Sequence, residues 1–292
     1  MDIMSALIKS LRPAQWTKNF FVFAGIVFSL KFFEINPLFK VIYAFIVFCF
    51  LSSSIYLIND VKDAESDRKH PVKKLRPIAA GQLNPIFAVF IALFLALIFL
   101  ISSIFLNASF ALIALIYFIL MVVYTFILRD IVILDIFSIA AGFVLRAVAG
   151  VVVIAVNLSP WLVICTILLS LFIALGKRRH ELVTLESKAA EHRKIFDEYN
   201  PQLLDQMISA VAGSTVVAYA LYTLWPETIA KFRTYNLAYS VPFVLYGIFR
   251  YLYLIYQKEK GGKPEELVLT DIPLMIDIIL WIMSLMAIIY LK

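Results

Sequence analysis

The sequence predicts an all-α, polytopic membrane protein, and three observations support this fold class. Hydrophobic residues make up 63% of the 292 residues and charged residues 16%, whereas soluble globular proteins have about 45–50% and about 25%. The apolar residues form continuous runs, unlike the alternating ten-residue segments of a membrane barrel. Nine runs approach the roughly 20 residues that a spanning helix needs. A soluble enzyme is therefore excluded.

The nine expected spans are separated by polar breaks of different lengths. Pro160, which follows a short polar turn, is well suited to the first turn of a helix. Three breaks are long, at 59–84, 177–205 and 258–271, and residues 182–205 are expected to form an amphipathic helix at the membrane surface that covers a cavity. We expect one integral-membrane domain over 1–292. The spans are 19–35, 40–58, 85–106, 108–128, 135–156, 160–176, 206–225, 237–257 and 272–291.

The distribution of positive charge predicts the orientation in the membrane. With a cytoplasmic N-terminus, the cytoplasmic segments carry 19 Lys and Arg residues and the opposite segments carry five. Short cytoplasmic loops are enriched in these residues, so we expect a multi-pass protein of the cytoplasmic (inner) membrane with its C-terminus outside. No basic face with interleaved aromatic residues lies free of the expected spans, which excludes nucleic acid as a partner.

The densest polar cluster follows the second expected span, between Asn59 and Asp67. On one continuous helix, Asn59, Asp63 and Asp67 would share a face, with Asp60 beside it. Carboxylates on one face repel each other, whereas Mg²⁺ prefers such oxygen ligands and keeps positions open for substrate phosphates. We therefore predict a Mg²⁺ site formed by Asn59, Asp60, Asp63 and Asp67. The alternative is a solvated acidic turn at the end of the span.

A basic loop follows this acidic helix, from His70 to Gly81. Pro71 is expected to end the helix, and Lys73 and Arg76 then lie within reach of any group that the metal binds. An acidic face beside a basic loop is an arrangement that binds a magnesium-chelated diphosphate. These polar residues all lie on the expected cytoplasmic side.

Together with nine spans, the run from Asn59 to Asp67 resembles the first aspartate motif of the UbiA superfamily of intramembrane prenyltransferases. Four segments, 12–19, 59–81, 134–150 and 158–178, are more specifically similar to its decaprenyl-phosphate phosphoribosyltransferase branch, and 241–265 is a weaker match. The resemblance implies a nine-helix UbiA-like bundle with a cavity facing the cytoplasm. It also implies Mg²⁺-dependent transfer of 5-phosphoribosyl from 5-phosphoribosyl 1-diphosphate to a polyprenyl phosphate, with release of diphosphate.

The resemblance assigns roles to individual residues. Its catalytic carboxylates are Asp63, Asp67 and Asp135, while Asp130 stays unassigned because five residues place it on another helix face from Asp135. For several residues a structural alternative remains open. Asp135 could cap a helix, Arg146 could form a pair between helices, and basic residues at span ends could serve orientation alone. The implied substrate-binding residues are Lys18, Asn19, Lys73, Arg76, Tyr124, Arg129, Arg146, Lys177 and Arg178.

Two other functions agree with part of the sequence. An ordinary UbiA prenyltransferase would transfer a prenyl group from its diphosphate to an aromatic acceptor, and it would need only one anion site. A secondary transporter would require an inverted repeat and charged residues near the bilayer midplane, whereas the polar residues here gather at one face. The expected partners are phosphoribosyl diphosphate, polyprenyl phosphate and the lipid bilayer. A homo-oligomer is left open.

Overall fold

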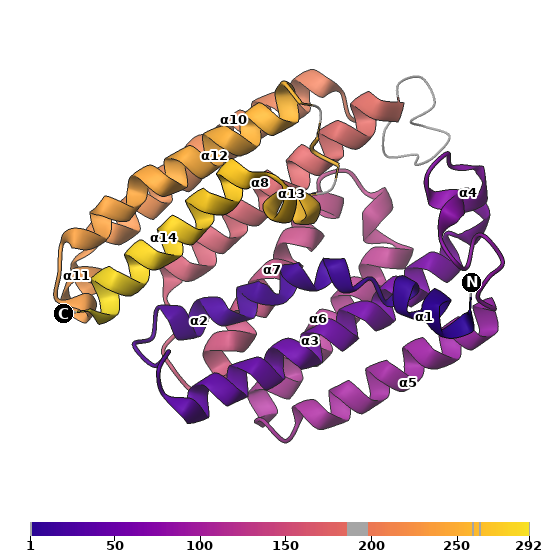
Figure 1. Ribbon diagram of the computed structural model, residues 1–292, viewed down its shortest axis with the longest axis horizontal. Coiled ribbons are helices and arrows are strands. Elements are labelled where there is room, and N and C mark those ends of the chain that lie inside the picture. Colours follow the sequence, from indigo (N-terminus) through magenta and orange to yellow (C-terminus); the bar gives the residue numbers. More distant parts are fainter. Residues whose placement is uncertain (1, 186–197, 259, 263, 292) are drawn as a thin grey trace. The chain divides into compact units, whose positions relative to one another are not determined.

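The computed structural model describes residues 2–185, 198–258, 260–262 and 264–291. The regular elements within these ranges are α-helices and 3₁₀ helices, so the all-α class is confirmed (Figure 1). Contacts divide the chain into two compact units, Met1–Ser138 with Leu145–Leu158, and Ile139–Val144 with Ser159–Lys292. Each unit is described by itself, and the single domain expected over 1–292 stays a prediction.

The first unit is built around one long helix, α3 (Ile35–Lys62), which packs against α1, η1, α5 and α6. Its core includes Phe48, Phe110 and Tyr117, and the Phe48 ring contacts the rings of the other two. The other elements of this unit are α1 (Ile3–Leu11), η1 (Pro13–Phe23), α2 (Ala24–Val27), α4 (Ala64–Lys69), η2 (Lys73–Leu75), α5 (Pro85–Ser103), α6 (Ala108–Phe126), η3 (Leu128–Asp130) and both ends of α7 (Leu134–Val153).

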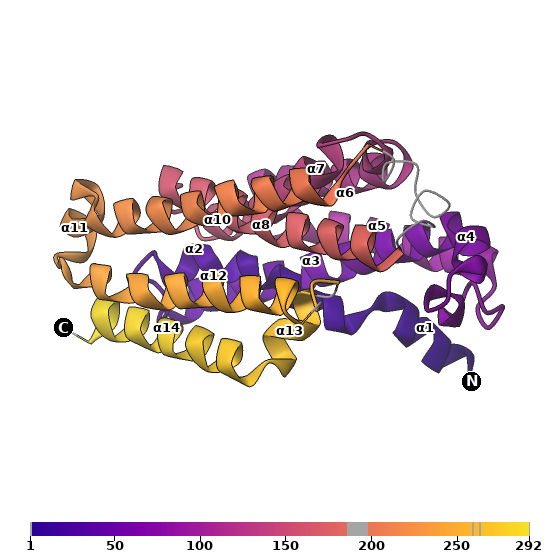
Figure 2. The same cartoon turned by 90° about the horizontal axis from the view of Figure 1, so that it is seen from above.

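The second unit consists of long helices in contact along their lengths. Helix α8 (Pro160–Leu185) packs against α10 (Pro201–Leu224), α10 packs against α12 (Val241–Tyr256), and α12 packs against α14 (Ile272–Tyr290). Figure 2 shows α12 and α14 side by side. Phe172 of α8 packs against Tyr251 of α12, with their ring centroids 5.2 Å apart. Shorter elements are α11 (Pro226–Phe232), η6 (Asn236–Ser240) and α13 (Pro264–Thr270).

Helix starts in both units follow local sequence signals. The Oδ1 atom of Asn84 accepts a hydrogen bond from the backbone N–H of Ile86 (2.8 Å), and Pro85 occupies the first turn of α5. The Oδ1 atom of Asn107 accepts from the N–H of Phe110 (2.7 Å) at the start of α6. These side chains satisfy N–H groups that have no partner inside the helix. The same device begins α10 at Asn200 and α14 at Asp271.

Eight helices among the described residues are long and apolar enough to cross a membrane, and they match the second to ninth expected spans. The first expected span, 19–35, differs: η1 continues to Phe23 and α2 ends at Val27. A 3₁₀ helix rises about 2.0 Å per residue, so residues 13–27 extend over about 28 Å. That length is close to the roughly 30 Å of a bilayer core. Residues 13–27 therefore extend nearly as far as a spanning α-helix, although they are fewer than the roughly 20 residues that such a helix needs.

Close backbone contact with α7 accompanies this long 3₁₀ segment. A Cβ atom on Gly150 would lie 1.8 Å from the carbonyl oxygen of Val22, and one on Gly25 would lie 2.9 Å from the backbone nitrogen of Val151. Long 3₁₀ runs have poor hydrogen-bond geometry and are uncommon, so contacts with the rest of the unit must stabilise η1. Glycine at positions 25 and 150 permits these contacts.

Candidate active site

The acidic residues lie where α3 ends, at a short interruption before α4. Asp63 separates the two helices, so the expectation of one continuous helix from Asn59 to Asp67 is wrong at this residue. The Asp63 N–H donates to the Asn59 carbonyl (2.9 Å), and the Asp67 N–H donates to the Asp63 carbonyl (2.8 Å). These bonds keep helical spacing across the interruption. Helix α4 ends at Lys69, two residues before Pro71, as expected.

Two arginines hold the buried carboxylates Asp60 and Asp67. Nη1 of Arg76 lies 2.6 Å from Oδ2 of Asp67 and 3.1 Å from Oδ1 of Asp60, so one guanidinium bridges both. Arg12 forms a second ion pair with Asp60. Arg12 is a site residue that our sequence reasoning missed. It opens one of the segments similar to the phosphoribosyltransferase branch, but nothing in the local sequence pairs it with an aspartate 48 residues away.

Arg129, on η3, binds the other half of the acidic cluster. Its two terminal nitrogens contact the two Asp63 carboxylate oxygens at 2.8 and 2.9 Å, and Nη1 also lies 3.3 Å from Oδ1 of Asn59. Such a two-pronged pair is among the stronger charge-assisted contacts. Burial opposes the charge on Arg129, but the hydrogen bonds and charge of Asp63 outweigh burial and raise the pKa of the guanidinium.

The cluster offers oxygen donors of the kind that Mg²⁺ prefers, three carboxylates and one amide. Among the described residues, however, no three His, Cys, Asp or Glu side chains are arranged closely enough to hold a metal ion. Arginine nitrogens lie between the carboxylates instead. The donor set therefore fits Mg²⁺ in its chemistry, and metal binding requires the guanidinium groups to move off these oxygens. The metal assignment stays a prediction.

The basic loop is ordered around His70. The Nδ1 atom of His70 accepts hydrogen bonds from the backbone N–H groups of Val72 (3.1 Å) and Lys73 (3.3 Å). This acceptor role assigns the ring proton to Nε2 when the ring is neutral. The Arg68 side chain donates to the Ala79 carbonyl (3.2 Å) and ties α4 to the end of the loop. These contacts bring Arg76 to the aspartates and leave Lys73 half-buried.

Asn19 and Arg146 form a second polar cluster, buried inside the first unit. Nε of Arg146 donates to Oδ1 of Asn19 (2.6 Å), and Nη2 donates to the Tyr117 hydroxyl (2.6 Å). The Asn19 amide donates to Sγ of Cys49 (3.3 Å). A buried charge requires such partners. These contacts favour the alternative in which Arg146 joins helices. Lys18, one residue before Asn19, bonds to the Gln15 side chain at 2.5 Å.

Asp135 is fully buried in the first turn of α7. The residue that precedes this helix is Ile133, which has a positive φ of 69°, so the alternative of Asp135 as the N-cap is wrong. A carboxylate in the first turn is favoured by the positive end of the helix dipole. Tyr124 lies half-buried on α6, while the Asp130 side chain is 48% exposed and lies 3.8 Å from Nε of Arg129.

Lys177 and Arg178 belong to the second unit, near the end of α8. Arg178 is buried and its Nη1 atom bonds to Glu181 at 2.8 Å. The backbone at Gly262 lies close to this end of α8, where a Cβ atom on Gly262 would lie 2.4 Å from the His180 ring. Of the surface helix expected over 182–205, residues 186–197 lie outside the described residues. Asp205 binds Arg179 at 2.5 Å from the start of α10.

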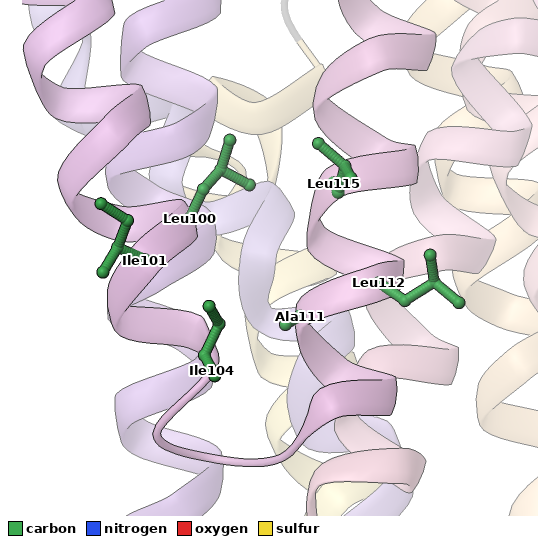
Figure 3. Close-up of a pocket in the computed structure, with 6 residues that line it drawn as sticks. All are labelled: Leu100, Ile101, Ile104, Ala111, Leu112 and Leu115. Carbon is green, nitrogen blue, oxygen red and sulfur yellow. The ribbon is translucent and has the colours of Figure 1, made fainter.

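A groove between α5 and α6 is unrelated to this polar chemistry (Figure 3). Leu100, Ile101 and Ile104 line one side of it, and residues of α6 line the other. All six lining residues are apolar, and they lie at the end of α5 that is opposite its start at Pro85. The groove suits a lipid chain rather than a reacting group.

Comparison with known proteins places the chain in a family. Residues 19–268 match the UbiA prenyltransferase family. The chain belongs to this family. It is 35% identical to a decaprenyl-phosphate phosphoribosyltransferase of Mycolicibacterium smegmatis, over 99% of this chain and 94% of the relative. It is 34% identical to the same enzyme of Corynebacterium glutamicum, over 99% and 88%. The resemblance expected from the sequence is confirmed.

A solved structure supports the fold at lower sequence similarity. The UbiA homologue from Archaeoglobus fulgidus, bound to GPP and Mg²⁺, has a TM-score of 0.74 with 20% identity, covering 97% of this chain and 99% of that protein. The UbiA-like membrane bundle expected from the sequence is therefore confirmed. The Mg²⁺ ion was observed in that homologue, and its binding to this protein is considered under the proposed function.

Proposed function

We propose that this UbiA family member transfers 5-phosphoribosyl from 5-phosphoribosyl 1-diphosphate to a polyprenyl phosphate and releases diphosphate. The observation that carries the proposal is identity of 35% and 34% to two decaprenyl-phosphate phosphoribosyltransferases over nearly the full chain. Similarity over 99% of the chain includes the segments that carry Asp63 and Asp135 and the basic segments that carry Lys73 and Lys177. Decaprenyl phosphate is the acceptor that these relatives' names suggest.

The acidic cluster is the proposed donor site. Asn59, Asp60, Asp63 and Asp67 would hold Mg²⁺, which neutralises charge on the departing diphosphate. Three guanidinium groups already lie against these carboxylates. Arginine binds diphosphate oxygens with the same paired geometry that it uses for carboxylates. We infer that Arg12, Arg76 and Arg129 turn from the aspartates to the diphosphate when the donor and metal bind.

The reaction breaks the bond between ribose C1 and the diphosphate oxygen and forms a bond between C1 and a lipid phosphate oxygen. Positive charge develops at C1 as the diphosphate leaves, so catalysis depends mainly on stabilising the leaving group electrostatically. The acceptor phosphate is an anion at neutral pH and needs no general base. Asp135 is the third proposed catalytic carboxylate, supported by its complete burial at the start of α7.

The remaining phosphates require cations of their own, because a desolvated phosphate must be matched by charge. The donor carries a 5-phosphate and the lipid adds a further anion. Lys18, Lys73, Lys177 and Arg178 are proposed to bind these groups, with Tyr124 beside Arg129. Asn19 and Arg146 are proposed to act by holding η1 in place, since their contacts are with each other and with buried neighbours.

The proposed location is the cytoplasmic membrane, with the N-terminus and the active site on the cytoplasmic side. Support comes from the excess of Lys and Arg in the segments that this orientation places inside. A phosphorylated sugar donor is water-soluble, so it would reach the site from that side. The long lipid tail would remain among apolar helix faces, where each buried CH₂ contributes about 0.8 kcal/mol.

The deciding experiment offers the purified protein two donor and acceptor pairs. We expect transfer of radiolabelled phosphoribosyl to polyprenyl phosphate, loss of transfer in EDTA and recovery on addition of Mg²⁺. Prenyl transfer from geranyl or farnesyl diphosphate to 4-hydroxybenzoate, without transfer to lipid phosphate, would establish the prenyltransferase alternative instead.

Asp63→Asn tests the donor site within the same assay. We expect this variant to lose nearly all transfer and to remain folded in detergent, because the substitution removes a hard, charged oxygen ligand. The matched control is Glu65→Gln, which neutralises an exposed acidic residue of α4 in the same segment. Full activity of Asp63→Asn in the presence of chelator would remove the metal from the mechanism.

A further inference from the structure

Helix α1 packs Leu7 and Leu11 against the core of the unit but exposes three other large apolar side chains. Ala6 and Ser10 are buried against the rest of the unit, whereas Ile3, Met4 and Ile8 are each more than half exposed. A helix on the surface of a soluble protein usually has one apolar stripe, which faces the core, and polar residues on the opposite face. The exposed side of α1 therefore faces an apolar medium rather than water alone.

The polar residues of α1 occupy a separate strip. With 3.6 residues per turn, Ser5 points about 100° away from Met4, and Lys9 lies about 100° from Ile8. Ser5 and Lys9 are both exposed. The helix thus has a strip that packs against the unit, an exposed apolar strip and an exposed polar strip, which is the pattern of a helix that lies in a membrane interface.

The loop after the aspartates continues this apolar surface. Val72 and Leu75, on either side of the basic pair Lys73-Lys74, are each more than half exposed. The Lys9 ammonium donates to the Leu75 carbonyl at 3.5 Å, which places the end of α1 next to η2. We define the α1–η2 surface as Ile3, Met4, Ile8, Val72 and Leu75.

Charge and position indicate what covers this surface. Four basic residues of α1, α4 and the loop are exposed, against two exposed acids, Asp2 and Glu65. The four are Lys9, Arg68, Lys69 and Lys74. At the same end of the unit, Ile86 in the first turn of α5 is 82% exposed, as a side chain that faces lipid would be. Basic residues around an exposed apolar strip match an anionic lipid surface.

We propose that the α1–η2 surface is a membrane-docking site, with its apolar side chains inserted among the headgroups of an anionic leaflet. The bilayer then fixes the depth of the loop that carries Arg76, the residue that bridges Asp60 and Asp67. A water-soluble phosphorylated donor and a lipid phosphate would meet at this depth. The docking site depends only on the fold and stands apart from the proposed reaction.

The test measures the depth of labels in lipid nanodiscs. Both native cysteines are replaced (Cys49→Ser, Cys165→Ser), and an environment-sensitive fluorophore is attached at Met4→Cys or Leu75→Cys. The matched controls are Ser5→Cys, the next residue of the same helix, and Ser66→Cys, exposed on α4. Each label is quenched by lipids with a nitroxide near the headgroup and, separately, by aqueous iodide. Because no substrate is present, the outcome is independent of the proposed reaction.

We expect several-fold stronger lipid quenching and weaker iodide quenching at positions 4 and 75 than at positions 5 and 66. Adding phosphatidylglycerol to phosphatidylcholine nanodiscs should increase the lipid quenching at both test positions, and Lys74→Gln should reduce that increase. Equal iodide quenching at all four positions would overturn the proposal. Protection from both quenchers at positions 4 and 75 would also overturn it, because a protein partner or second copy would then cover the surface.

Discussion

Substitution of Gly150 by alanine tests the close contact between η1 and α7. In most helices this change stabilises by about 0.5–1 kcal/mol, because alanine loses less backbone entropy. Here the new Cβ atom would lie 1.8 Å from the Val22 carbonyl oxygen and 2.7 Å from its carbon. Both atoms are backbone, so no side-chain rotation relieves the overlap. The steric term must therefore reverse the sign of the usual effect.

The size of the effect follows from the displacement that is needed. Contacts below 3.0 Å are essentially never seen for real Cβ atoms, so η1 and α7 must separate by more than 1 Å. Overpacking of this kind costs about 1–3 kcal/mol or more, and displacement of η1 also weakens the bond between Asn19 and Arg146. Because the overlap is with backbone atoms, the upper end of that range applies, and after the usual gain of about 0.5–1 kcal/mol is subtracted we expect a net loss of about 2 kcal/mol. This is a factor of about 30 in the ratio of folded to unfolded protein.

Gly213→Ala provides the matched control, because Gly213 lies within α10 and a Cβ atom there would meet nothing within 4 Å. Thermal unfolding in detergent should show a Tm at least about 4 °C lower for Gly150→Ala and slightly higher for Gly213→Ala, at about 2–4 °C per kcal/mol. Equal or higher stability of Gly150→Ala would refute the backbone contact between η1 and α7 and the argument built on it.

Three further substitutions test other contacts. Arg76→Ala leaves buried Asp60 and Asp67 without their bridging cation, so thermal unfolding in detergent should show a decrease of about 3–5 kcal/mol in the free energy of unfolding. Lys74→Ala, which changes an exposed residue of the same loop, should alter this free energy little. Tyr117→Phe removes the hydroxyl that accepts a hydrogen bond from Arg146 at 2.6 Å, so the free energy of unfolding should fall by about 1.5–3 kcal/mol. An unchanged Tm would contradict this expectation. Hydrogen bonds from Arg250 lower the pKa of Asp271, so its stabilising effect is complete at neutral pH and is lost as pH falls below about 4. The Tm difference between wild type and Asp271→Asn should be constant from about pH 6 to 8 and shrink in acid.

The features that could be predicted from the sequence are those with local causes. Asn84 followed by Pro85, and Asn107 three residues before Phe110, specify helix starts within one turn of chain, and the structure places the helices there. The acidic motif and the basic loop after it are also close in sequence, so their proximity follows from chain length alone.

The features that escaped prediction depend on contacts between distant residues. Residues 19–23 belong to the first expected spanning α-helix, and their 3₁₀ conformation goes with contacts to α7 at Gly150, more than a hundred residues later. Likewise, the pairing of Arg12 with Asp60 joins two helices whose packing no local pattern encodes. The break at Asp63 accompanies its two-pronged contact with Arg129, another long-range partner.

The winding of η1 sets a distance between two polar layers of the first unit. Arg12, at the aspartate cluster, and Asn19, at the Arg146 cluster, are seven residues apart, about 14 Å along a 3₁₀ axis. Side chains this far apart do not interact directly, and substitutions at such separations usually have additive effects. We therefore expect the stability effects of Arg76→Ala and Tyr117→Phe to be additive in the double variant.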